Sequence, residues 1–187
     1  KVGTFFKKVK FSARGIDGLI NSSNTQIKIK SNLMVELNSE NILTAVAISR
    51  SIGIKAKAIE QGIAECPLIP GRMESFTLKN NGIAILDYAH TPEAYTKVMI
   101  TLKLILSDEG HIYVVFGAGG DRDKKKRPQM AKALERYAKH CFITPDNPRY
   151  ESQNEINNQI IKGFKQNQYS VYDDRVQGIK AAINIAK

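Results

Sequence analysis

Alternating apolar and polar positions predict β-strands near the start of the chain, and helical spacing takes over after residue 38. The strands are expected at Val2–Phe11 and Thr25–Ile29, with Gly15, Gly18 and the polar cluster 21–24 as breaks. A helix is predicted over residues 39–52, with Gly53 as its C-terminal cap, and a second helix over Ala56–Ala64. Pro67, Pro70 and Gly71 then interrupt the pattern, which places a domain boundary near Pro70.

Beyond Pro70, short apolar runs alternate with helical patterns. The expected elements are a hairpin of residues 73–78 and 83–87 around Asn80-Asn81-Gly82, a helix started by Thr91, Pro92 and Glu93 that ends near Ser107, a strand at 111–116, a helix from Pro128, a strand at 141–144, a helix at about 153–165, a strand at 169–172 and a last helix from Asp174. This order predicts an α/β fold, with an open parallel sheet and covering helices.

Composition narrows the class of protein without choosing a function. The chain has 187 residues with 42% hydrophobic content, enough for a folded core, and it has neither a membrane-length apolar run nor a secretory signal, so the cytoplasm is expected. Cys66 and Cys141 have no metal-binding spacing, and Cys141 is expected in the core. The net charge of +10 favours anionic partners. Because the chain begins at Lys1 without Met and ends inside a predicted helix, we expect a fragment of a longer protein.

Three loops that follow predicted strands are rich in polar groups, and ligands of open α/β sheets bind at such carboxyl ends. The loops comprise residues 87–92, 117–124 and 146–149, and we expect them to share one edge of the sheet. Gly117, Gly119 and Gly120 could let backbone N–H groups approach an anion, with Arg122 as the nearest side chain. The loop matches neither GxGxxG nor a phosphate-binding P-loop. A βα turn with a solvated basic tail at residues 124–127 explains it equally well.

The loop at residues 146–149 displays an acid and a base together. Pro148 holds the segment extended, so Asp146 and Arg149 are presented at defined positions. A carboxylate accepts from an ammonium group and a guanidinium forks onto a carboxylate, which suits a zwitterionic amino acid. The alternative is a plain Asp-Asn-Pro turn whose arginine makes a surface ion pair.

Other polar residues have ordinary explanations beside functional ones. Asp87 and His90 bracket a strand-to-helix corner and could hold a metal-bound water or a nucleotide, or could only stabilise the turn. Asn38 is a good N-cap whose side chain would reach the backbone of Asn41. Arg72 lies at the predicted boundary, where ligand clefts form, although a linker arginine is usually solvated.

Six motifs in this order make the chain resemble the Mur ligases of peptidoglycan synthesis, in particular those that add meso-diaminopimelate. They are Asn38-Ser39-Glu40-Asn41-Ile42-Leu43-Thr44-Ala45, Pro70-Gly71-Arg72-Met73-Glu74, Leu86-Asp87-Tyr88-Ala89-His90-Thr91-Pro92, residues 115–124 with Lys126-Arg127-Pro128, Asp146-Asn147-Pro148-Arg149, and Asp174-Arg175. The resemblance implies that residues 1–70 end a central α/β ATPase domain and that residues 71–187 form most of a Rossmann-like C-terminal domain.

The implied reaction is ATP-dependent amide formation. ATP would phosphorylate the D-glutamate carboxylate of UDP-N-acetylmuramoyl-L-alanyl-D-glutamate, and an amino group of meso-diaminopimelate would attack the acyl phosphate, with Mg2+ neutralising the phosphates. The expected partners are these small molecules, with no nucleic acid and no membrane. The family's P-loop, magnesium-binding acids and modified lysine have no counterpart in this chain, so we expect no catalytic or metal-binding residue in it and no activity from it alone.

The resemblance also assigns binding residues. The nucleotide-contacting positions, and their neighbours in the same cleft, are Asn38, Asn41, Arg72, Asp87, Tyr88 and His90, and the diaminopimelate positions are Arg122, Asp146, Asn147, Pro148 and Arg149. Val35 and Leu37 stand where the family has a glycine and an aromatic residue, and Lys125 replaces a usual glycine.

Two alternatives stay open. A lysine-adding relative would not need Arg149, because lysine lacks the second carboxylate that this arginine would bind. A non-catalytic basic module for nucleic acid would be favoured by aromatic residues among the basic ones, and residues 121–127 contain none.

Overall fold

The computed structural model describes residues 3–12, 15–33, 36–67, 69–79, 82–107 and 109–186. The chain divides into two compact units, one of residues 1–76 with 85–88, the other of residues 77–84 with 89–187. We describe each unit by itself. Within the described residues, no helix combines the length and the apolar character that crossing a bilayer requires.

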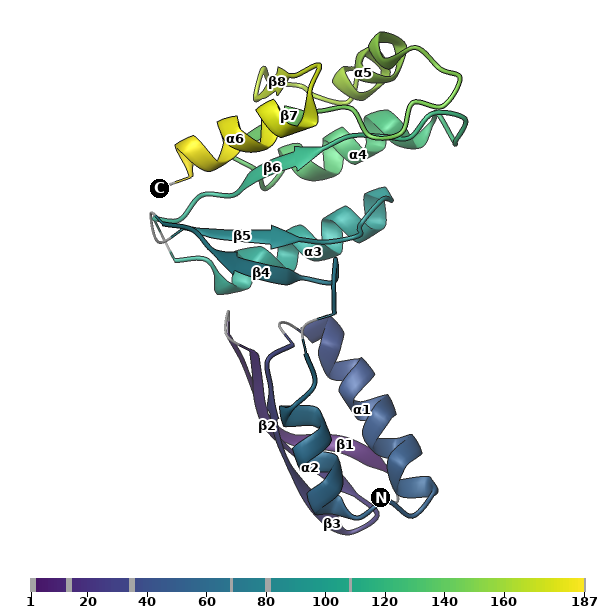
Figure 1. The fold of residues 1–187 in the computed structure, drawn as a ribbon, viewed down its shortest axis with the longest axis vertical. Helices are drawn as coiled ribbons and strands as arrows, with labels where there is room; N and C mark the ends of the chain where they lie inside the picture. Colours follow the sequence, from purple (N-terminus) through teal and green to yellow (C-terminus); the bar gives the residue numbers. More distant parts are fainter. Residues whose placement is uncertain are drawn as a thin grey trace. The chain divides into compact units, whose positions relative to one another are not determined.

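The first unit packs two helices against an antiparallel sheet in the order β1-β2-β3 (Figure 1). Its elements are β1 (Thr4–Ser12), β2 (Gly15–Ser22), β3 (Thr25–Ser31), α1 (Glu36–Ser51) and α2 (Ala56–Ala64). Isoleucines alternate along β2 and β3, so one face of the sheet meets α1 and α2 in a closed core. The buried members are Ile16, Ile20, Ile27, Ile29, Ile42, Val46 and Ile59.

The sequence pattern does not predict strand β2, because Gly15 and Gly18 interrupt it. Gly15 has φ +134°, and a β-carbon there would lie within 3.0 Å of the Ser31 carbonyl oxygen. A β-carbon on Gly18 would meet the carbonyl oxygen of Lys8 at 2.8 Å and the Phe6 ring at 3.1 Å. Both glycines therefore permit close approach of neighbouring strands inside the sheet. Of the predicted break at residues 21–24, only Ser23 and Asn24 form the turn, with φ of +46° and +65°.

Helix α1 begins three residues earlier than predicted, at Glu36. Asn38 therefore lies inside its first turn, so the prediction of Asn38 as N-cap is wrong. The prediction of Gly53 as C-cap is confirmed: its φ is +86°, its N–H donates to Arg50 O at 3.1 Å, and the N–H of Ile54 donates to Ser49 O at 3.0 Å. These are the paired bonds of a Schellman motif. The bounds of α2 agree with the prediction.

The two strands near the predicted boundary, β4 (Glu74–Thr77) and β5 (Ile83–Leu86), pair in a sheet of their own. The N–H of Leu78 donates to Gly82 O at 2.8 Å, as expected for strands joined by a short turn. Asn80 and Asn81, the predicted turn residues, lie outside the described residues, as does Val35; the side chain of Leu37 is also outside the description.

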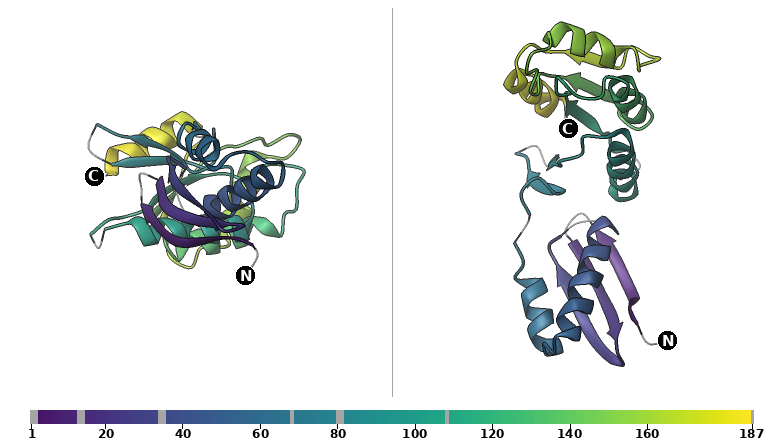
Figure 2. Two further views of the ribbon diagram at one scale, coloured as in Figure 1. Left: turned by 90° about the horizontal axis from the view of Figure 1, so that it is seen from below. Right: turned by 90° about the vertical axis from the view of Figure 1, so that its right-hand side faces the viewer.

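The second unit holds the predicted parallel sheet, in the order β6-β7-β8. Its elements are α3 (Pro92–Ile105), β6 (Tyr113–Phe116), α4 (Lys126–Glu135), β7 (His140–Ile143), α5 (Gln153–Ile161), β8 (Tyr169–Val171) and α6 (Arg175–Ile185). Helices α4 and α6 lie on opposite faces of the sheet (Figures 1 and 2). The predicted α/β class, with a parallel sheet and covering helices, is confirmed.

The core of this unit lies between the sheet and helices α3, α4 and α5. It buries Met130, Leu134, Cys141, Ile143 and Ile156 among others. Cys141 is fully buried, as predicted, and burial raises the pKa of its thiol to about 12. Local signals place two helix starts correctly: the Thr91 hydroxyl accepts from the N–H of Ala94, and the Asp174 carboxylate accepts from the N–H of Gln177.

Candidate functional site

The loops after β6 and β7 interlock at the carboxyl edge of the parallel sheet. The N–H of Thr144 donates to Phe116 O at 2.9 Å, and the N–H of Gly120 donates to Asn147 O at 2.8 Å. A β-carbon on Gly117 would fall within 3.0 Å of Thr144 O, and one on Gly120 within 3.0 Å of Pro148 O. These two glycines allow the loops to approach each other, and the Gly120 N–H is already used in holding them together.

This edge brings the predicted diaminopimelate residues together. Gly119 lies close to both arginines: a β-carbon built on it would be 3.1 Å from Arg149 Nη1 and 3.9 Å from Arg122 Cγ. Arg149 Nη1 also donates to the carbonyl oxygen of Gly120. Asp146, Asn147, Arg122 and Arg149 are exposed, and Pro148 is half-buried. Both arginines therefore come near Gly119, Arg149 through its guanidinium and Arg122 through Cγ of its side chain.

The loop after β7 also receives a contact from the last helix. Arg175, in the first turn of α6, donates from Nη1 to Thr144 Oγ1 at 3.2 Å and to Pro145 O at 3.1 Å. Gly178 packs against Thr144 one turn later. Helix α6 therefore supports the loop that carries Asp146 and Arg149.

The third predicted loop follows β5, which belongs to the separate two-stranded sheet. The prediction of one shared sheet edge therefore holds for two loops and is wrong for the third. His90 is exposed and lies in the segment that leads into α3 of the second unit.

Apart from His90, the residues predicted to contact the nucleotide lie in the first unit. The Arg72 guanidinium lies over the Tyr88 ring, with its carbon 5.4 Å from the ring centroid, and Tyr88 is 67% exposed. Asp87 accepts a 3.0 Å hydrogen bond from the N–H of Met73, whose φ of +49° lies in the left-handed region. Asp87 thereby holds the backbone next to Arg72 in a conformation that a non-glycine residue rarely adopts.

The two asparagines lie together in α1 of the same unit. Asn41 Nδ2 donates to Asn38 Oδ1 at 3.3 Å. Asn38 is buried and Asn41 is exposed. Asn38 is thus the buried acceptor and Asn41 the exposed donor of this pair.

Sequence reasoning missed Arg127 and Glu151. The sequence places Arg127 in a basic tail for which a solvated surface is one of two equally good interpretations, but Arg127 is only 1% exposed and forms a two-bond ion pair with Glu151. A signal was available: Arg127 shares the 3.6-residue spacing of Met130, Ala131 and Leu134, the buried face of α4. Lys124 also pairs with Glu151, at 3.2 Å. The solvated-tail interpretation is therefore wrong for Arg127, while Lys124 stays exposed.

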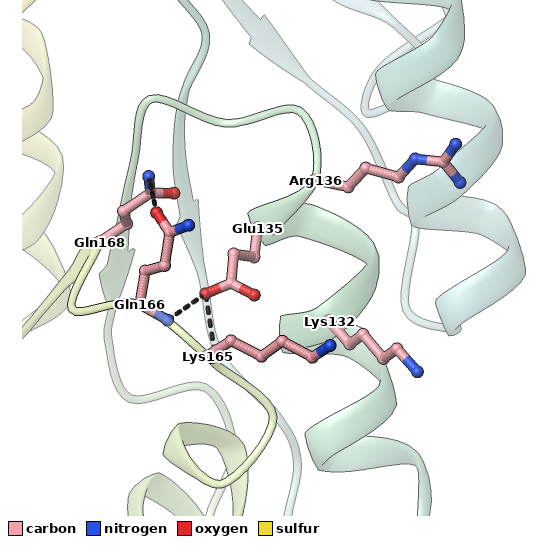
Figure 3. A pocket seen from close by; sticks show the side chains of 6 residues that line it. All are labelled: Lys132, Glu135, Arg136, Lys165, Gln166 and Gln168. Carbon is pink, nitrogen blue, oxygen red and sulfur yellow. Dashed lines mark hydrogen bonds between the residues drawn. The ribbon is translucent and has the colours of Figure 1, made fainter.

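Hollows of the surface also form away from these loops. One of about 380 Å³ forms between the end of α4 and the segment before β8, lined by Lys132, Glu135, Arg136, Lys165, Gln166 and Gln168 (Figure 3). There the Glu135 carboxylate accepts hydrogen bonds from the backbone N–H groups of Lys165 and Gln166 at 2.8 and 2.7 Å. It therefore holds the segment before β8 against the end of α4. Among the described residues, no three His, Cys, Asp or Glu side chains are arranged to hold a metal ion.

The fold and the loops together define a Rossmann-like α/β domain. Its candidate ligand-binding side chains lie at the carboxyl edge of the parallel sheet. Residues 71–187 match the family described as Mur ligase, glutamate ligase domain. The chain belongs to the Mur ligase family.

Relatives agree with this assignment. The chain is 34% identical over 184 residues (95% of the chain, 36% of the relative) to a protein of Prochlorococcus marinus subsp. pastoris named UDP-N-acetylmuramoyl-L-alanyl-D-glutamate--2,6-diaminopimelate ligase. It is 38% identical over 161 residues (86% and 33%) to the protein of the same name from Fusobacterium nucleatum. The chain therefore spans about a third of the length of these curated relatives.

Solved structures show the same fold. A structure of a ligase with that name has a TM-score of 0.66 and 29% identity, covering 98% of this chain and 38% of the other. The folylpolyglutamate synthase of Mycobacterium tuberculosis, complexed with ADP and AMPPCP, has a TM-score of 0.76 at 19% identity, covering 96% and 40%.

Proposed function

We propose that the protein to which this chain belongs is an ATP-dependent amide ligase that adds meso-diaminopimelate to the D-glutamate of UDP-N-acetylmuramoyl-L-alanyl-D-glutamate. Residues 1–70 would end its central ATP-binding domain, and residues 71–187 would form most of the C-terminal domain that brings the amino acid. Its nucleotide substrates place it in the cytoplasm. The names of the relatives support this reaction, and the Arg149 guanidinium next to Gly119, in the same pair of loops as Arg122, carries the choice of amino acid.

The amino-acid site follows from charge. Meso-diaminopimelate has two carboxylates and two ammonium groups, whereas lysine has a single carboxylate. Arg149, held on the Gly120 carbonyl through one nitrogen, keeps the rest of its guanidinium for a substrate carboxylate. Arg122 lies in the adjoining loop, with Cγ near Gly119. Asp146 and the Asn147 side chain would receive an ammonium group, with Pro148 keeping both in place.

The nucleotide site is proposed in the first unit. The flat Arg72–Tyr88 pair offers a surface for a base and a positive charge for a phosphate, while Asp87 holds the adjoining backbone. Asn41 offers an exposed amide group that the buried Asn38 orients. ATP is the proposed co-substrate. Mg2+ would neutralise the phosphates during transfer, and none of the described residues is proposed as its ligand.

Transfer would proceed through an acyl phosphate. The D-glutamate carboxylate attacks the terminal phosphorus and releases ADP, and the diaminopimelate amine then attacks the acyl carbon and expels phosphate as the amide forms. The second unit binds and orients the amine. By holding the amine next to the acyl phosphate, the second unit would reduce the entropic cost of bringing the two reactants together.

The test is amino-acid-dependent ADP release by the full-length protein with the UDP-linked dipeptide, comparing meso-diaminopimelate with L-lysine. We expect turnover with diaminopimelate only. Turnover with lysine would retain the ligase and refute the role of Arg149; no turnover with either would refute the ligase and return attention to a basic binding module.

Arg149→Ala is the matching variant. A charge-assisted hydrogen bond contributes about 1.5–3 kcal/mol, so the KM for diaminopimelate should rise about 10-fold to 100-fold while the KM for ATP stays within about twofold. Arg136→Ala is the control. It removes an exposed arginine at the C-cap of α4, outside both proposed sites, and should change neither KM. Equal increases in both constants for Arg149→Ala would contradict the pocket assignment.

A further inference from the structure

A buried arginine ties four segments of the second unit together. Arg127 Nη1 donates to Glu151 Oε2 at 2.8 Å and to Gln159 Oε1 at 2.7 Å. Its Nη2 donates to Glu151 Oε1 and to Gly119 O, both at 2.9 Å. One guanidinium thus joins α4, the loop after β6, the loop after β7 and α5. A charge this deeply buried is tolerated only where its partners compensate for lost hydration.

Glu151 extends the connection to the loop that carries Arg122. Its Oε1 also accepts from the N–H of Asp121 at 2.6 Å, and its Oε2 lies 3.2 Å from Lys124 Nζ. The hydrogen bonds from Arg127 are the main reason that the pKa of Glu151 is lowered to about 2. The carboxylate is therefore ionised at any pH at which the protein would work.

The backbone that these bonds hold is unusual. Asp121 and Arg149 both have φ of +50°, a conformation that non-glycine residues rarely adopt and that persists only where surrounding contacts enforce it. Asp121 Oδ2 accepts a 3.3 Å hydrogen bond from the N–H of Tyr150, the residue after Arg149. This bond joins the two left-handed segments directly. Asp121 immediately precedes Arg122, so both proposed substrate-binding arginines sit on or beside a left-handed residue.

We propose that Arg127 and Glu151 are positioning residues that set the relative placement of Arg122 and Arg149 for the amino-acid substrate. This inference rests on the proposed function. The pair touches no substrate. It acts by holding the loops of residues 119–122 and 147–151 in a fixed relative position. Arg122 and Arg149 are then already oriented when the substrate binds.

Arg127→Lys in the full-length protein tests the inference. Lysine keeps the charge, but its single ammonium cannot reach both Glu151 oxygens, Gln159 and Gly119 at once. We expect the KM for meso-diaminopimelate to rise at least tenfold while the KM for ATP changes less than twofold. Glu151→Gln, which keeps the shape and removes the charge, should do the same. Met130→Ala is the control: Met130 is buried on the same face of α4, so thermal stability should fall with both KM values unchanged.

Hydrogen exchange supplies a readout that needs no substrate. In Glu151→Gln the amide of Asp121 should exchange faster than in the wild type, while the amides of β7 keep their protection. If Arg127→Lys does not fold, Gln159→Ala removes one of the four bonds and should shift the diaminopimelate KM in the same direction.

The outcomes separate the two proposals. A folded Arg127→Lys with an unchanged KM for diaminopimelate, equal increases for both substrates, or unaltered exchange at Asp121 in Glu151→Gln would each overturn the positioning role. A wild-type protein without diaminopimelate-dependent ADP release would refute the proposed function instead. The exchange measurement would then still decide whether the pair holds the loop.

Discussion

Two helical glycines should respond in opposite directions to replacement by alanine. Gly178 lies inside α6 and Gly62 inside α2. Because glycine loses more backbone entropy than alanine in a helix, replacement by alanine should by itself stabilise either helix by about 1 kcal/mol. A β-carbon on Gly62 meets nothing within 4 Å. Gly62→Ala should therefore stabilise its unit by about 1 kcal/mol.

At Gly178 the new methyl group has no room. It would lie less than 3.0 Å from Thr144 Cγ2, where ordinary contacts begin at 3.4 Å. Thr144 is fully buried, and its hydroxyl is held between Phe116 O and Arg175 Nη1, so its side chain cannot rotate away without losing these bonds. Overpacking costs about 1–3 kcal/mol, so Gly178→Ala should be destabilising by up to about 2 kcal/mol after the helix gain is subtracted.

Calorimetry of the full-length protein measures the difference, with hydrogen exchange of the β7 amides assigning the transition of the second unit. For a domain of about a hundred residues, each kcal/mol shifts Tm by roughly 4–8 °C. We expect the transition to fall in Gly178→Ala and the first unit's transition to rise in Gly62→Ala. An increase in Tm for Gly178→Ala that matches Gly62→Ala would refute the packing argument.

Three further changes test the local chemistry. Thr91→Ala removes the side-chain acceptor for the Ala94 amide and should cost about 1 kcal/mol in thermal unfolding, whereas Thr91→Ser should cost far less. The pKa of Cys141 is raised from 9.0 to about 12, so the thiol ionises first in the unfolded protein and stability falls as the pH rises from 9 toward 12. In Cys141→Ala this part of the fall in stability should be absent when unfolding is measured against pH. The pKa of Glu151, lowered from 4.5 to about 2, means that its contribution is complete above pH 4.5 and is lost as pH falls toward 2; the Tm difference between wild type and Glu151→Gln should shrink over that range, and a constant difference would contradict it.

Much of the fold follows from short-range patterns that can be seen in the sequence. The Schellman motif at Gly53, the N-caps at Thr91 and Asp174 and the apolar run that becomes β6 depend on neighbours within a few residues, so their signals are local. The burial of Cys141 likewise follows from the apolar run that it opens. The resemblance to the Mur ligases pointed to Arg122 and Arg149 without geometry.

Tertiary structure alone decided where long-range partners meet. The glycines of β2 appear as breaks until the backbone of β3 and the Phe6 ring lie against them. Asp87 and Met73 are fourteen residues apart and join only when β4 and β5 pair. Arg127 and Glu151 are twenty-four residues apart. A charged residue in a basic run is ordinarily solvated, and it becomes internal here because the parallel sheet places a carboxylate, an amide oxygen and a carbonyl around its guanidinium.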